Sequence, residues 1–177
     1  DFHAQAFRLN RFESLTKPDA PEYDETVGAE AAAASSLFFD RVFETGGGLR
    51  EILTSPRGFV GPALAPLYGV DPPAAIEERT LDASRAGYFM QVPFLLLFSD
   101  GEEPGTLGRG GALNTEMLCF QTNPIHDTIP SSPDLPGRTN RERVEAVTGG
   151  AGCGGCHGAL INPLGFAFEG FDGLGRG

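Results

Sequence analysis

Two cysteines and a histidine near the end of the chain form the pattern with the clearest chemistry. Cys153 and Cys156 stand three residues apart, and His157 follows directly. This CxxCH spacing is the attachment pattern of c-type haem, in which both thiols add to vinyl groups on one edge of the ring and the histidine ligates the iron through Nε2. The sequence therefore predicts one covalently bound haem c.

Two other kinds of site compete for the same residues. A structural zinc ion could be held by the cysteine pair together with Cys119 and His126, which is a permitted Cys₃His set, although the usual second CxxC pair is missing. A thioredoxin-like dithiol requires an apolar strand before the motif, whereas "VTGGAG" precedes it here. A chance pairing is disfavoured because the chain has three cysteines in all. Under the haem interpretation Cys119 has no partner in the chain, so we expect a buried thiol or a cross-link to another part of a parent protein.

The residues after the motif could complete a haem pocket. The Nδ1–H of His157 needs an acceptor to fix the ring, and a backbone carbonyl near Asn162 or Pro163 could supply it. The apolar tail is expected to fold back over the haem, with Asp172 turning the chain by accepting local backbone N–H groups. The rings expected to wall the porphyrin are Phe166, Phe168 and Phe171, and the arginines expected to meet its propionates are Arg109, Arg138 and Arg141, with Arg176 as a weaker candidate.

The sixth iron ligand must come from upstream or from another chain. Twenty residues follow His157, and none of them is Met or His. We place Met90 first, with Met117 and His126 as alternatives and His3 more remote; an open iron position is the remaining option. Thioether ligation would raise the reduction potential and favour electron transfer.

Composition excludes several classes of partner. The formal net charge of −11 argues against nucleic acid and against an anionic membrane surface. The longest apolar run, "VPFLLLF" at 92–98, is far shorter than the roughly 20 residues of a membrane span. Lys17 is the only lysine, which excludes a lysine-ringed docking face. Because the chain starts at Asp1 without Met and stops on "GLGRG", we expect a piece of a larger, processed protein.

The pattern of apolar residues predicts a mainly α fold, in which a small helical cytochrome-like haem domain (74–177) follows a helical module (1–73), with Gly/Pro-rich loops. The two modules could pack as one globular unit. Thr139 and Glu142 form a capping box, and Gly149 follows the end of that helix. The expected helices are 2–12, 27–45, 49–55, 61–70, 112–121 and 139–147, with loop at 100–111, a proline-rich extended stretch at 122–137, an undecided buried helix or strand within 85–100, and at most short strands.

The stretch "RERVEAVTGGAGCGGCHGALINPLGFAFEGFDGLGR" resembles the end of the large secreted cytochrome-like proteins of planctomycete-type bacteria, which are strings of modules of unknown function with CxxCH sites. Their motif reads roughly CxxCHxxIDPxGFxxENFDxxGR; Asn162 and Gly170 stand where it tends to have Asp and Asn. "RAGYFMQVPFLLLFSDGEEPGTLGRG" is similar to the opening of the same module, which supports the choice of Met90. "FHAQAFRLNRF" and "LREILTSPRGFVGPALAPLYGV" resemble a neighbouring module, and "FQTNPIHDTIPSSP" replaces a run that is mostly proline in the family.

The resemblance implies haem and a periplasmic or extracellular location, but no particular reaction. We expect a mono-haem c-type cytochrome module that transfers electrons outside the cytoplasm, with no catalytic residues. Its redox partner would be the rest of a parent protein or another subunit. One alternative is a peroxidase-like or substrate-oxidising haem enzyme, with His126 and either Arg109 or Arg138 as distal acid and base. A structural haem domain of a secreted assembly is the other.

Overall fold

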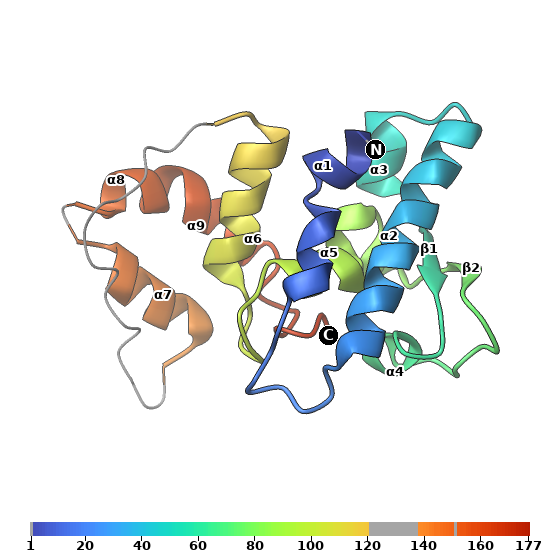
Figure 1. Ribbon diagram of the computed structural model, residues 1–177. Helices are drawn as coiled ribbons and strands as arrows, with labels where there is room; N and C mark the ends of the chain where they lie inside the picture. The colour runs from blue at the N-terminus through green and yellow to red at the C-terminus, as the bar shows by residue number, and fades with distance from the viewer. Residues whose placement is uncertain (1, 121–137, 151) are drawn as a thin grey trace.

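The computed structural model describes residues 2–120, 138–150 and 152–177, and the described part is mainly helical, as predicted (Figure 1). The elements in chain order are α1 (Phe2–Ala6), η1 (Leu9–Ser14), α2 (Glu25–Glu44), α3 (Leu49–Thr54), β1 (Arg57–Val60), α4 (Ala65–Tyr68), β2 (Glu77–Thr80), η2 (Ala83–Arg85), η3 (Tyr88–Met90), α5 (Val92–Leu97), α6 (Thr106–Ala112), η4 (Leu113–Met117), α7 (Asn140–Thr148), α8 (Gly154–Cys156), η5 (His157–Ile161) and α9 (Asn162–Phe166). The elements η1, η2 and η3 are 3₁₀-helical, whereas η4 and η5 are π-helical.

The longest helix, α2, follows the apolar stripe that predicts it. Ala31, Ala34, Phe38 and Val42 are all buried on one face. The helix begins two residues before the predicted start because Asp24 caps it, its carboxylate accepting a hydrogen bond from the Val27 N–H at 3.0 Å. The helix predicted over 139–147 is confirmed as α7, in which both hydrogen bonds of the capping box between Thr139 and Glu142 are present.

The N-terminal segment differs from the expectation of one helix over 2–12. It forms two short helices, α1 and η1, because Arg8 takes a left-handed backbone conformation with φ of 54°. The break allows side chains on both sides of it to be buried. Phe7 stacks on Phe39 with ring centroids 4.4 Å apart, while Phe12 is 5 % exposed.

Strands are short, as predicted. β1 and β2 pair antiparallel, with Arg57 opposite Thr80. The helix expected over 61–70 is only the four residues of α4, with Pro66 in its first turn. The stretch 85–100, for which the sequence left helix or strand undecided, contains the helix α5. All six residues of α5 are buried, and Pro93 lies in its first turn.

One hydrophobic core draws on both halves of the chain. α2 and α5 meet in it, and Phe168 and Leu174 join them from the C-terminal end. The predicted division at residue 73 stays a prediction. A set of aromatic side chains in the core makes an unbroken series of contacts: Phe7, Phe38, Phe39, Tyr88, Phe89, Phe94, Phe98 and Phe168.

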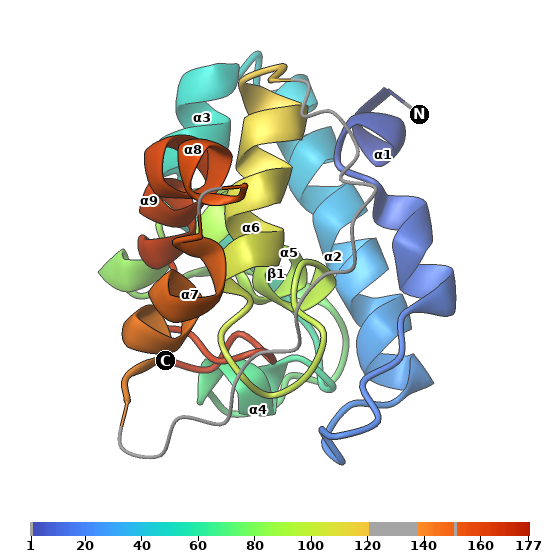
Figure 2. The same cartoon turned by 90° about the vertical axis from the view of Figure 1, so that its left-hand side faces the viewer.

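The expected loop over 100–111 is confirmed for 100–105 and wrong for the rest, because α6 begins at Thr106 in spite of three glycines. Gly110 of α6 and Gly165 of α9 belong to a helix crossing. A Cβ at Gly110 would overlap the Ile161 carbonyl, and one at Gly165 would overlap the Thr106 carbonyl. Glycine at these positions lets α6 and α9 approach backbone to backbone, so the helical run from α8 to α9 lies against α6 (Figure 2).

Candidate functional site

The two thiols of the CxxCH motif lie on a single helical turn. Cys153 is half-buried, Cys156 is exposed, and both are free thiols. The His157 N–H donates to the Cys153 carbonyl at 3.0 Å, which closes this turn. Side chains three apart on a helix share a face. The turn therefore places both sulfurs on one face, which is the arrangement that haem c attachment would require.

The imidazole that follows is oriented by a chain of hydrogen bonds. Thr148 Oγ1 donates to the Val144 carbonyl at 2.7 Å, so it accepts from Asn162 Nδ2 at 2.8 Å. The other amide atom, Asn162 Oδ1, then faces His157 Nδ1 at 3.3 Å. Because that oxygen can only accept, Nδ1 carries the proton and Nε2 keeps its lone pair for a metal.

The hydrogen-bond acceptor for His157 Nδ1 was expected to be a backbone carbonyl near Asn162 or Pro163. The acceptor does belong to Asn162, but it is the side-chain amide oxygen. Asn162 is only 5 % exposed, and its amide connects η5 to the end of α7. Pro163, by contrast, is exposed at the first turn of α9.

The motif opens a π-helical turn that faces another. η5 starts at His157, and η4 lies at the end of α6. Asn114 Nδ2 joins them by donating to the Leu160 carbonyl at 2.9 Å and to the Gly110 carbonyl at 3.0 Å. Within the described chain, the buried Oδ1 of Asn114 has no hydrogen-bond partner. π-Helical turns are rare in proteins, and those that occur are often at functional sites. Two of them in contact beside the CxxCH motif therefore indicate a functional site at this end of the fold.

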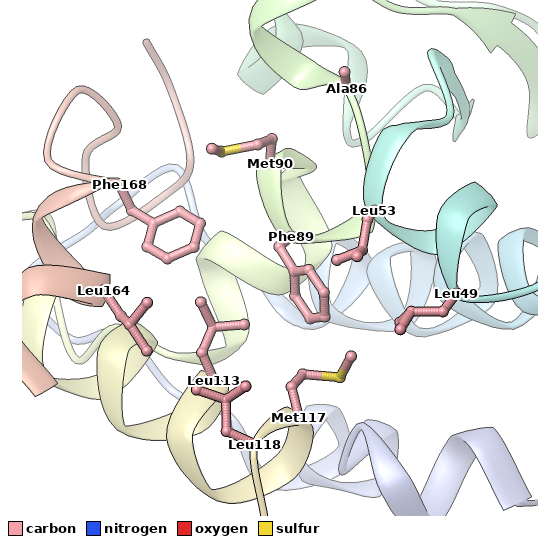
Figure 3. A pocket seen from close by; sticks show the side chains of 10 residues that line it. All are labelled: Leu49, Leu53, Ala86, Phe89, Met90, Leu113, Met117, Leu118, Leu164 and Phe168. Carbon is pink, nitrogen blue, oxygen red and sulfur yellow. The ribbon is translucent and has the colours of Figure 1, made fainter. Parts of the chain in front are cut away.

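An apolar cavity of about 360 Å³ lies beside this helical run (Figure 3). The last residues of α9 and those after it form one wall, α3 another, and the segments around η3 and η4 the rest. Both methionines of the chain, Met90 and Met117, line it. The full lining is Leu49, Leu53, Ala86, Phe89, Met90, Leu113, Met117, Leu118, Leu164 and Phe168.

Arg109, expected to meet a propionate, has a different position. It is fully buried, and its guanidinium donates to the carbonyls of Leu95, Phe168, Phe171 and Asp172. Burial lowers its pKa to about 10, with the Asp172 carboxylate opposing that shift. Arg109 therefore fastens the C-terminal tail to the end of α5, and the expectation of a propionate contact is wrong because its donors are already engaged.

The other two arginines are at the surface. Arg138 pairs with Glu142 at 3.3 Å, and Arg141 pairs with Glu169 at 2.5 Å. The Arg141 guanidinium also lies 4.1 Å from the centroid of the half-buried Phe166 ring. A propionate contact for either arginine stays a prediction.

The C-terminal tail folds back, but it packs on the hydrophobic core of the protein, whereas we expected it to cover the haem. Phe168, Phe171 and Leu174 are buried in the shared core, and the Arg85 guanidinium lies 4.3 Å from the Phe171 ring centroid. Of the three expected porphyrin walls, Phe168 is therefore a core residue that also reaches the cavity. The predicted turn is confirmed, because Asp172 Oδ1 accepts from the N–H groups of Leu174 and Arg176 at 2.9 and 2.8 Å.

The zinc alternative gains no support from the described residues. Among them, no three His, Cys, Asp or Glu side chains gather as metal ligands. Cys119 is exposed, with φ of 52°, which corrects the expectation of a buried thiol. His126 lies outside the described residues. None of the described helices is long and apolar enough to span a membrane.

Sequence reasoning missed Asn114, Thr148 and Arg85. Arg85 donates to the Gly175 carbonyl at 2.6 Å and packs on Phe171. No sequence signal marks Asn114 or Thr148, because their partners are set by how α6 and α7 meet η5 and α9. Arg85 was noticed only as part of the stretch that carries the resemblance.

The comparisons with known proteins identify modules and no activity. Residues 85–177 match PSCyt3, described as a protein of unknown function (DUF1588), and residues 1–70 match PSD4, described as a protein of unknown function (DUF1592). Both are modules found in planctomycete cytochrome-like proteins, which confirms the module content that the resemblance implies. No curated protein and no solved structure matches the chain.

Proposed function

The chain belongs to the PSCyt3 family of proteins of unknown function (DUF1588), and from this premise we propose that it is a mono-haem c-type cytochrome module that transfers electrons outside the cytoplasm. Haem c would be attached through Cys153 and Cys156, and His157 would ligate its iron. The bound group supplies a one-electron couple at the iron. The redox partner would be the rest of a parent protein or another subunit.

One observation carries this proposal. The relay from Val144 through Thr148 and Asn162 fixes the proton of His157 on Nδ1, next to two free thiols on one turn. A histidine that serves as a metal ligand needs such an outer partner to hold its tautomer and ring orientation. A redox dithiol or a surface cysteine pair has no use for that relay.

The choice of electron transfer over catalysis follows from the arginines. The haem-enzyme alternative uses His126 with Arg109 or Arg138 as distal acid and base. Arg109 directs its donors to four backbone carbonyls, so it is not available for this role, and Arg138 is left as the arginine candidate. Electron transfer needs only the iron and its ligands.

Expression in cells that mature c-type cytochromes tests the proposal. The intact mass should equal the polypeptide plus one haem, and the reduced protein should show a low-spin c-type spectrum. Cys153→Ala with Cys156→Ala should abolish attachment, whereas Cys119→Ala, the control for a free cysteine elsewhere in the chain, should leave it intact. His157→Ala should keep the haem mass and lose the low-spin spectrum. An intact mass equal to the bare polypeptide for the unaltered chain would overturn the proposal.

A further inference from the structure

Both methionines of the chain line one cavity, although they stand 27 positions apart in the sequence. Met90 belongs to η3 and Met117 to η4. Among the residues that the structure describes, the other eight lining side chains are leucine, phenylalanine and alanine, so the two thioether sulfurs are the only described side-chain atoms of the lining with lone pairs that suit a haem iron.

The cavity adjoins the helical run that starts at the CxxCH motif. Leu164 and Phe168 line it, and Leu164 follows His157 by seven residues. At 1.5 Å per residue this is on the order of 10 Å along the run. For one iron to bind both His157 and a side chain of the cavity, the haem must lie between the run and the cavity, with the two ligand atoms directly opposite each other on its two faces.

The cavity also needs the N-terminal family segment. Leu49 and Leu53 come from α3, within the PSD4 match, while the remaining lining residues come from the PSCyt3 match. Leu49, Leu53 and Leu118 are 58 %, 46 % and 59 % exposed, which leaves an apolar rim at the mouth. An apolar macrocycle entering the mouth would cover these leucines and remove them from water.

The two methionines are directed differently. Figure 3 shows the Met90 thioether extending toward Phe168, on the side of the C-terminal run, and the Met117 thioether extending toward the side where Leu49 lies. We propose that this cavity is the distal side of the haem site, that the sulfur of Met90 is the sixth iron ligand, and that Leu49 and Leu53 shield that side. This inference rests on the proposed function and adds that two family segments together complete the site.

Met90→Leu and Met117→Leu in the haem-loaded protein test the ligand. Each substitution conserves volume. In Met90→Leu we expect loss of the weak charge-transfer band that marks thioether-to-ferric-iron ligation, a lower midpoint potential, and carbon monoxide binding where the parent protein binds little. Met117→Leu tests the other thioether of the cavity and should retain the band, because that sulfur is directed away from the C-terminal run.

Leu53→Ser and Leu37→Ser test the shielding. Leu37 is a leucine of α2 outside the cavity, 38 % exposed against 46 % for Leu53. A polar group near the iron stabilises the ferric charge, so Leu53→Ser should lower the midpoint potential, and Leu37→Ser should leave it unchanged.

The intact mass of every variant separates the two proposals. If the haem is attached but Met90→Leu keeps the band and the potential, or only Met117→Leu loses them, the Met90 assignment is overturned while the proposed function stands. Equal potentials for the Leu53 and Leu37 variants overturn the shielding by α3. Absence of attached haem in the unaltered chain overturns the proposed function itself.

Discussion

The C-terminal tail and the CxxCH run are adjacent in sequence, but they differ in how many of their polar groups are bonded to the rest of the protein. Along residues 168–176, Arg109 binds three backbone carbonyls and Arg85 binds a fourth. Along residues 153–157, both thiols are free, and only Nδ1 of the histidine has a protein partner among the described residues. Contacts within the protein therefore hold the tail in place, whereas the sulfur atoms and the imidazole Nε2 of the run stay available to bind another group.

The tail also helps to position the proposed haem site. Phe168 belongs to the shared core and to the cavity wall, so the contacts that fasten the tail also position one side of the proposed haem site. Gly110 and Gly165 then fix how closely the run approaches α6. Changes in the tail should therefore reduce folding stability, and changes in the run should mainly affect the spectrum and potential of the haem-loaded protein.

The largest expected effect on stability comes from replacing Arg109, the arginine that fastens the tail. Arg109→Met removes the donors for the carbonyls of Leu95, Phe168, Phe171 and Asp172. An unsatisfied buried acceptor costs about 1–3 kcal/mol, so the free energy of unfolding should fall by at least ~3 kcal/mol. Because the chain has no tryptophan, urea unfolding is best followed by far-ultraviolet circular dichroism.

Arg109→Lys is the control for charge. An ammonium keeps the charge but cannot match the planar fork of five donors, so most of the loss should remain. A Met variant as stable as the parent would show that the tail does not depend on this guanidinium.

A smaller effect is expected at the helix crossing. Gly165→Ala places a Cβ against the Thr106 carbonyl. Overpacking of this kind costs typically about 1–3 kcal/mol, and α9 should move away from α6. Gly111→Ala is a control in α6 with open space around the new Cβ, and it should stabilise the protein by up to ~1 kcal/mol. Equal changes in the urea midpoint for the two variants would contradict the close crossing.

In the run, the expected effect is on His157, the proposed iron ligand. Asn162→Asp offers a carboxylate to His157 Nδ1, which makes the imidazole a stronger donor to iron and should lower the midpoint potential of the haem-loaded protein. Asn140→Asp is the matched control, since the Asn140 amide donates to Thr106 Oγ1 at 2.8 Å much as the Asn162 amide donates to Thr148. A redox titration should show a shift for the Asn162 variant alone, and equal potentials would mean that this relay does not reach the iron.

The sequence predicted the features that depend on neighbours in the chain. The capping box of α7, the stripe of α2 and the turn at Asp172 all involve partners within a few residues, and all three are confirmed. The features it missed depend on packing. Three glycines in α6 indicated loop, because nothing local shows that Gly110 faces the backbone of η5 and α9.

Arg109 was misassigned for a similar reason. An arginine beside a predicted haem motif is a reasonable propionate ligand until its burial is known. The cavity was likewise invisible in the sequence, although Met90 and Met117 had been named. Their shared position is set by how α3, η3 and η4 meet around α9.

The smallest expected effect concerns Lys17, the only lysine, which is 4 % exposed and adds to the tail's contacts. Its Nζ donates to the carbonyl and the hydroxyl of Ser99 at 2.7 and 2.8 Å, and the Ser99 hydroxyl donates to the Gly173 carbonyl. Burial and the nearby Arg109 charge lower the pKa of Lys17 to about 8, against the opposing effect of Asp100 and Asp172. The folded state therefore releases this proton more readily than the unfolded state does.

Between about pH 8 and pH 10.5 the unfolded chain keeps the Lys17 proton while the folded protein loses it. The unfolding free energy should therefore rise with pH across this window, by at most ~1.4 kcal/mol per pH unit, and the penalty of the buried charge should be fully present below it. Tyr68 and Tyr88, whose pKa values burial raises, oppose the rise above about pH 10, where the unfolded chain ionises them first. Urea unfolding of the parent and of Lys17→Met at pH 7.5 and pH 9.5 isolates the lysine, since both proteins share the tyrosines. The parent should gain stability relative to the variant over this interval, and an identical pH dependence would show that Lys17 keeps its proton in the folded protein.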